Sequence, residues 1–150
     1  MLVAATVAQR VVFSSGSQIP SSVSVGGVGD VDGDGRPDFI LGKPLVSRVA
    51  SQAGSATVYS GATGMPILTI LGTNPYGRLG TSVAIGPDLN GDGHCDPVVG
   101  APGPSFSPGH VRIHSGVTAA LLADLSDGTD EFGRVAFAVV PDQWMPMCVL

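Results

Sequence analysis

Residues 29–44 read GDVDGDGRPDFILGKP, and residues 87–102 read PDLNGDGHCDPVVGAP. Each stretch is an acidic loop followed by a short apolar run and a Gly-x-Pro turn, and the two align at an offset of 58 residues. Further along, the Ser-Gly pair at residues 60–61 aligns with the Ser-Gly pair at residues 115–116, at an offset of 55. Because these segments recur in the same order, the chain contains an internal duplication with a period of about 55 residues.

The composition excludes several fold classes. The 150 residues have the length of one ordinary domain. The 22 glycines and 12 prolines exclude a helical bundle, because both residues interrupt helices. A hydrophobic content of 43% and a mean hydropathy of +0.35 exclude a disordered chain. Short bursts of Val, Ala, Leu and Ile between turn residues predict an all-β protein, and no apolar run is long enough to predict a membrane span.

Each repeat unit is predicted to contain four short strands. In the central unit the strands are expected at residues 81–85, 97–100, 110–114 and 120–124, separated by Gly- and Pro-rich turns. Short, evenly spaced strands are compatible with a sandwich, a barrel or a propeller, and four antiparallel strands in each 55-residue unit favour propeller blades. The whole chain, residues 1–150, is therefore interpreted as one partial propeller domain with an incomplete ring. Its predicted parts are blade units at 23–71 and 81–125 and strands of neighbouring blades at 11–13 and 134–140.

The two acidic loops have the composition of calcium sites. Each carries oxygen-bearing side chains at positions 1, 3, 5 and 9, with glycines at positions 4 and 6 that allow the backbone to curl around an ion. Calcium takes six to eight oxygen ligands, and one of them is often a backbone carbonyl at position 7. Two calcium ions are therefore predicted. The ligands expected in the first loop are Asp30, Asp32, Asp34, Asp38 and the carbonyl of Arg36, and those in the second are Asp88, Asn90, Asp92, Asp96 and the carbonyl of His94.

Other interpretations of these loops are less favourable. An EF-hand needs an acidic ligand at position 12, where this chain has Leu41 and Val99 in apolar runs. Asp-Gly pairs also form plain turns, but two nine-residue matches in register within a repeat favour ion binding. His94 and Cys95 leave zinc as a minor alternative, although Arg36 occupies the position of His94 in the first loop.

The rest of the chain gives few signals of other functions. The seven basic residues are scattered singly, which argues against nucleic-acid binding. The two cysteines, Cys95 and Cys148, do not make a disulfide framework, and the apolar start of the chain lacks the basic residues of a signal peptide. His110, Arg112 and His114 share one face of a predicted strand. We expect that face to be solvated, with an imidazole site as the minor alternative.

Together, these motifs resemble the FG-GAP repeat, the blade unit of integrin α-subunit propellers and of many bacterial secreted or surface proteins. The family's Phe-Gly is matched at residues 132–133 and loosely at 79–80, and its Gly-Ala-Pro is matched at 100–102 and loosely at 42–44. Both acidic loops match its calcium loop. The resemblance implies a propeller whose calcium loops join the first two strands of each blade, and an extracellular or cell-surface location.

The function expected from this resemblance is a calcium-stabilised scaffold for adhesion or ligand recognition, within a larger secreted or surface protein. The chain shows no nucleophile elbow and no phosphate-binding loop, so it is not expected to be an enzyme itself. The alternatives are a non-catalytic part of an extracellular hydrolase and a truncated reading frame without independent function. The expected partner is a protein or carbohydrate ligand, and open blade edges also predict self-association.

Overall fold

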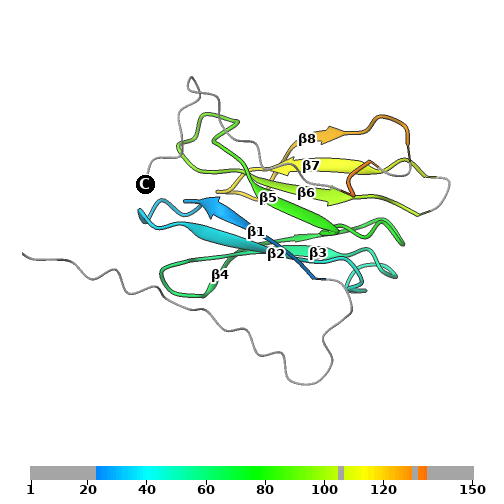
Figure 1. Ribbon diagram of the computed structural model, residues 1–150, viewed down its shortest axis with the longest axis horizontal. Coiled ribbons are helices and arrows are strands. Elements are labelled where there is room, and N and C mark those ends of the chain that lie inside the picture. The colour runs from blue at the N-terminus through cyan, green and yellow to red at the C-terminus, as the bar shows by residue number, and fades with distance from the viewer. Residues whose placement is uncertain (1–22, 105–106, 130–131, 135–150) are drawn as a thin grey trace, which may run out of the picture.

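The regular elements of the chain are all β-strands. The computed structural model describes residues 23–104, 107–129 and 132–134, and within them eight strands form two four-stranded antiparallel sheets (Figure 1). The first sheet contains β1 (Ser24–Gly29), β2 (Asp38–Lys43), β3 (Ser55–Tyr59) and β4 (Pro66–Leu71). The second contains β5 (Ser82–Ile85), β6 (Pro97–Ala101), β7 (His110–His114) and β8 (Leu121–Leu125).

This architecture confirms the predicted all-β class and the four-stranded propeller-type blades. The strands of the central unit lie within one residue of their predicted bounds. In each sheet the strands follow one another in chain order, as expected when short turns join neighbours. The predicted segment at 11–13, and all but the first residue of that at 134–140, lie outside the described residues. Within the described part of the chain no helix is long and apolar enough to cross a bilayer.

The two sheets repeat each other in hydrogen-bonding detail. Ser24 pairs with Gly42 between β1 and β2, and Ser82 pairs with Gly100 between β5 and β6. The Ser24 hydroxyl donates to the carbonyl of Gly80 at 2.7 Å, and the Ser82 hydroxyl donates to the carbonyl of Gly133 at 2.8 Å. Gly133 therefore occupies, relative to the second sheet, the place that Gly80 occupies relative to the first.

The hydrophobic core lies between the stacked sheets, where β5 packs against β1 and β2 (Figure 1). The core side of the first sheet carries Ile40, Ala56 and Val58, which are fully buried. Every residue of β5 and β6 is buried, whereas β8 exposes Leu121 and Leu125. The buried cluster consists of Val31, Ile40, Ala56, Val58, Ile70, Leu79, Val83, Ile85, Cys95, Val99 and Ala101.

Small residues allow the two sheets to approach this closely. A Cβ atom at Gly42 would collide with the backbone carbonyl of Gly80 and with the Ser24 hydroxyl. The equivalent Gly100 is confined in the same way by Gly133 and Ser82. Because the nearest colliding atoms include the backbone carbonyls of Gly80 and Gly133, a change of rotamer in a neighbouring residue cannot make room for a side chain.

We expect Gly42→Ala to lower the free energy of unfolding by about 1–3 kcal/mol, the usual cost of overpacking a dense site. Gly86→Ala is the control, because the nearest atom to its Cβ would be the carbonyl oxygen of Asp96 at 3.3 Å and its φ is not positive. Urea unfolding followed by circular dichroism measures both changes. Equal effects of the two substitutions would contradict the assigned close approach between the sheets.

Candidate metal centre

Both acidic loops lie at the same end of the sheets, between the first and second strands of each blade. In the first loop the carboxylate of Asp30 accepts three backbone hydrogen bonds. Gly33 N and Asp34 N donate to its Oδ1 at 2.6 and 3.2 Å, and Gly35 N donates to Oδ2 at 2.8 Å. Gly33 and Gly35 have φ values of 78° and 82°, a left-handed conformation that glycine adopts without steric cost.

The second loop has the same arrangement around Asp88. Its Oδ1 accepts from Gly91 N at 2.6 Å and from Asp92 N at 3.2 Å, and its Oδ2 accepts from Gly93 N at 2.7 Å. The two glycines have φ values of 80° and 88°. These backbone donors, with that of Gly93 foremost, lower the pKa of Asp88 below its usual value.

The carboxylate at position 9 joins each loop to the rest of its blade. Asp38 is 2% exposed and accepts hydrogen bonds from Val31 N at 2.7 Å and from Gly61 N, in the β3–β4 turn, at 2.9 Å. Asp96 is fully buried, and the corresponding donors are Leu89 N at 2.8 Å and Gly116 N, in the β7–β8 turn, at 3.0 Å. Each position-9 carboxylate therefore closes its own loop and fastens it to a neighbouring turn.

Three carboxylates converge in the first loop. One oxygen from each of Asp30, Asp32 and Asp38 lies within 4.8 Å of the other two, and among the described residues no other group of three or more acidic, His or Cys side chains meets this closely. Burial, together with the charges of Asp38, Asp34 and Asp30, raises the pKa of Asp32 despite a hydrogen bond from Asp34 N. Asp34 lies outside the cluster, and its Oδ1 accepts from Arg36 N at 2.8 Å. Arg36 is exposed.

The second loop is less convergent. Asp92 is held by neighbouring side chains, because its Oδ2 accepts from Asn90 Nδ2 at 2.8 Å and from the Ser115 hydroxyl at 3.4 Å. Asn90 Oδ1 accepts from Asp92 N at 3.0 Å. The amide at position 3 thus takes the structural place of Asp32 without its charge.

The side chain of His94 connects the two loops. Its Nδ1 lies 2.8 Å from the carbonyl oxygen of Val31 in the first loop and donates a hydrogen bond to it. Cys95 N also donates to the carbonyl of Asp30 at 3.2 Å, and the Cys95 side chain belongs to the buried core. The imidazole therefore makes a contact between blades. The contact depends on how the blades stack, and the sequence analysis missed it.

The expectation of a solvated face on β7 was partly wrong. The side chains of His110 and Arg112 are 31% and 18% exposed, and both bind Asp124: His110 Nδ1 at 2.7 Å from Oδ1, and Arg112 Nε at 3.1 Å from Oδ2. His114 is only 8% exposed. Its Nδ1 bonds the carbonyl of Ala119 at 2.9 Å, and burial lowers its pKa. The second blade packs the end of this strand more closely than strand alternation alone indicates.

The comparisons with known proteins agree with these loops and sheets. Residues 22–59, which include β1, the first acidic loop, β2 and β3, match the family model described as FG-GAP repeat. The chain carries an FG-GAP repeat. It is 38% identical to mouse integrin alpha-IIb over 106 residues and 37% identical to human integrin alpha-IIb over 115 residues, or 63% and 69% of this chain. A match to chicken integrin alpha-V, at 37% identity, covers 50% of the chain. The matched part of the chain spans 7–11% of the length of these integrin alpha chains.

The buried Asp96 gives a prediction about pH. Burial, helped by the charges of Asp92 and Asp88 and opposed by the two backbone donors, raises the pKa of Asp96 above 3.8. An acid whose pKa is higher in the folded chain stabilises the fold while it is protonated, and this contribution is lost as pH rises through that pKa. In metal-free buffer, wild type should therefore lose stability relative to Asp96→Asn as pH rises from below 3.8 to neutral.

Asp127→Asn is the control, because the pKa shift of Asp127 predicts the opposite dependence of stability on pH. Hydrogen bonds from Thr129 lower the pKa of the exposed Asp127, so its stabilising contribution is present above 3.8 and lost as pH falls through the lowered pKa. Urea unfolding at a series of pH values, in sulfate to favour the folded state, gives both comparisons. A stability difference between wild type and Asp96→Asn that does not change with pH would contradict the raised pKa.

Proposed function

We propose that this chain is a calcium-binding FG-GAP module that acts as a scaffold for adhesion or ligand recognition. The observation that carries the proposal is that both acidic loops have the same hydrogen-bonded arrangement. Two loops, 58 residues apart, hold carboxylates at positions 1 and 9 with equivalent backbone donors, and each loop is fastened to its blade by the buried aspartate at position 9. A plain turn does not require a buried carboxylate at position 9.

The donor set fits calcium. The proposed ligands are side-chain oxygens at positions 1, 3, 5 and 9 of both loops, with the carbonyls of Arg36 and His94 at position 7. Zinc fits less well, because the imidazole Nδ1 of His94 bonds Val31 and Cys95 lies in the core. A divalent cation supplies positive charge where three carboxylate oxygens now converge. The ion pairs between described side chains involve Asp124 and not these aspartates.

Calcium binding would also raise the free energy of unfolding of the module. An ion that binds only the folded chain adds RT ln(1 + [L]/Kd), about 2.7 kcal/mol per site at one hundred times Kd. That is a large share of the stability of an ordinary domain. Because the loops of the two blades are joined through His94 and Cys95, ions held in both would also stiffen the contact between blades.

The wider role rests on the similarity to integrin alpha chains. We place the chain in an extracellular or cell-surface protein, with blade units at 23–71 and 81–125. A protein or carbohydrate is the ligand, and no catalytic role is assigned. The exposed Leu121 and Leu125 of β8 favour association with a further blade or with another copy of the chain.

Isothermal titration with calcium tests the two sites. Wild type should bind two ions, and the first loop should bind more tightly because it offers four carboxylates where the second offers three and an amide. Asp34→Ala should remove or strongly weaken the first site, and Asp92→Ala the second.

Asp127→Ala is the matched control, since it removes one exposed carboxylate outside both loops and should leave both sites intact. Circular dichroism in calcium confirms that the variants are folded. If Asp34→Ala and Asp92→Ala both keep two sites of unchanged affinity, the loops are not the ligands.

A further inference from the structure

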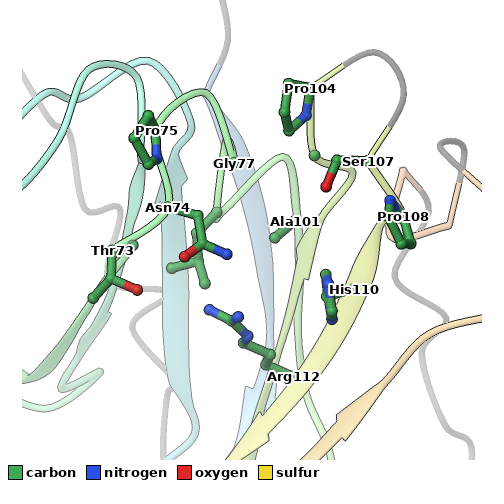
Figure 2. Close-up of a pocket in the computed structure, with 13 residues that line it drawn as sticks. Thr73, Asn74, Pro75, Gly77, Ala101, Pro104, Ser107, Pro108, His110 and Arg112 are labelled. Atoms are coloured by element: carbon green, nitrogen blue, oxygen red, sulfur yellow. The ribbon is translucent and has the colours of Figure 1, made fainter.

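A small pocket lies between the two blades, at the end of the sheets opposite the acidic loops. It occupies about 170 Å³, between the β4–β5 loop and the β6–β7 loop, which are joined by a hydrogen bond from Gly103 N to the carbonyl of Gly77 at 3.3 Å (Figure 2). Leu79 and Ala101 supply apolar lining. The volume is below the roughly 300–1,000 Å³ of sites for drug-sized molecules, so it suits one side chain or a group of similar size.

Arg112 provides the only full positive charge in the lining. Figure 2 shows its guanidinium directed from β7 across the pocket towards Asn74. Its Nε is taken by Asp124, and this is the one hydrogen bond that the side chain makes to the described residues. The two Nη groups, which form the fork that pairs with carboxylates, therefore remain available to a ligand.

Asp124 holds this donor in place from outside the pocket. Its two oxygens bind Arg112 Nε and His110 Nδ1, so one carboxylate fixes both side chains on β7. The side chain of Arg112 is 18% exposed and that of His110 is 31% exposed, so the arginine is partly withdrawn from solvent. A charge-assisted hydrogen bond is stronger in such a place than at an open surface. The donor is thus positioned before any ligand arrives.

The lining of the pocket contains no acidic residue. The protein has 12 acidic residues against 7 basic ones, yet the pocket presents Arg112, His110, Asn74, Thr73 and Ser107 as its polar side chains. In the first blade the position equivalent to Arg112 is Thr57, which pairs with Thr69 at 3.1 Å. The arginine in this pocket is therefore a feature of the second blade and not of the shared repeat.

We propose that this pocket binds a single carboxylate group, such as an aspartate or glutamate side chain of a protein ligand. The Nη groups of Arg112 receive the carboxylate in a forked pair, and Asn74 adds an amide donor from the facing loop. The carboxylate site gives the proposed scaffold a class of ligand, and the assignment rests on the proposed role in ligand recognition. It does not depend on the acidic loops, which lie at the other end of the blades.

The test is an amide-resolved NMR titration of the 150-residue chain with N-acetyl-aspartamide (side-chain carboxylate free) at saturating calcium. The signals of Gly77, Ala101 and Gly103, and of the Arg112 side chain, should shift and saturate, while those of the acidic loops stay in place. The neutral analogue N-acetyl-asparaginamide should produce no saturating shift. Sulfate, which does not precipitate millimolar calcium, serves as a second anion, and binding tighter than that of the carboxylate would overturn the assigned ligand class.

Arg112→Gln should weaken binding of the carboxylate about tenfold or more, the loss expected for a hydrogen bond to a charged group. Arg112→Lys should recover only part of it, because an ammonium keeps the charge without the fork. Arg48→Gln removes an exposed arginine outside the pocket and should change nothing. The spectrum itself reports whether each variant is folded. Equal binding by wild type and Arg112→Gln, or equal shifts with the two probes, would overturn the proposal. Shifts confined to the acidic loops would also overturn it, because they would show that the carboxylate does not bind in the pocket.

Discussion

The buried aspartate that ends each acidic loop is the constraint on which the rest of the molecule depends. Asp38 and Asp96 each bind one backbone N–H of their own loop and one in a turn two strands away. A buried carboxylate must be fully satisfied to be tolerated, so each loop can take only a narrow set of conformations. The carboxylates at the other loop positions are then brought together whether or not the repulsion between them is relieved.

The repulsion between these carboxylates is the reason that the folded loops favour binding of a cation. Burial and neighbouring charges raise the pKa of Asp32 in the first loop and of Asp96 in the second, as expected where carboxylates are crowded without a counterion. A calcium ion would reverse this effect, because its charge favours the ionised forms. His94 extends the consequence to the stacking of the blades, since its ring bonds the first loop while its backbone belongs to the second.

Local features of this chain could be predicted from its sequence because they depend on short-range chemistry. The acidic loops have glycines at the positions where positive φ is needed, and the strands lie between Gly and Pro turns, so both were found from spacing alone. The contacts between blades could not be predicted in this way. The link from His94 to Val31 and the pocket around Arg112 both depend on how residues more than 30 positions apart are stacked. The repeated Ser-Gly pair, which served above only to align the two units, also marks the turns whose glycines donate hydrogen bonds to Asp38 and Asp96.

The most direct test of the calcium account is a crystal structure of the chain grown in calcium, with data collected at a long wavelength where calcium scatters anomalously. The account predicts two anomalous peaks, one in each loop, with oxygen ligands at about 2.3–2.6 Å. The peak in the first loop should be bounded by Asp30, Asp32 and Asp38. Loops that keep the described backbone but show no anomalous peak in saturating calcium would contradict it.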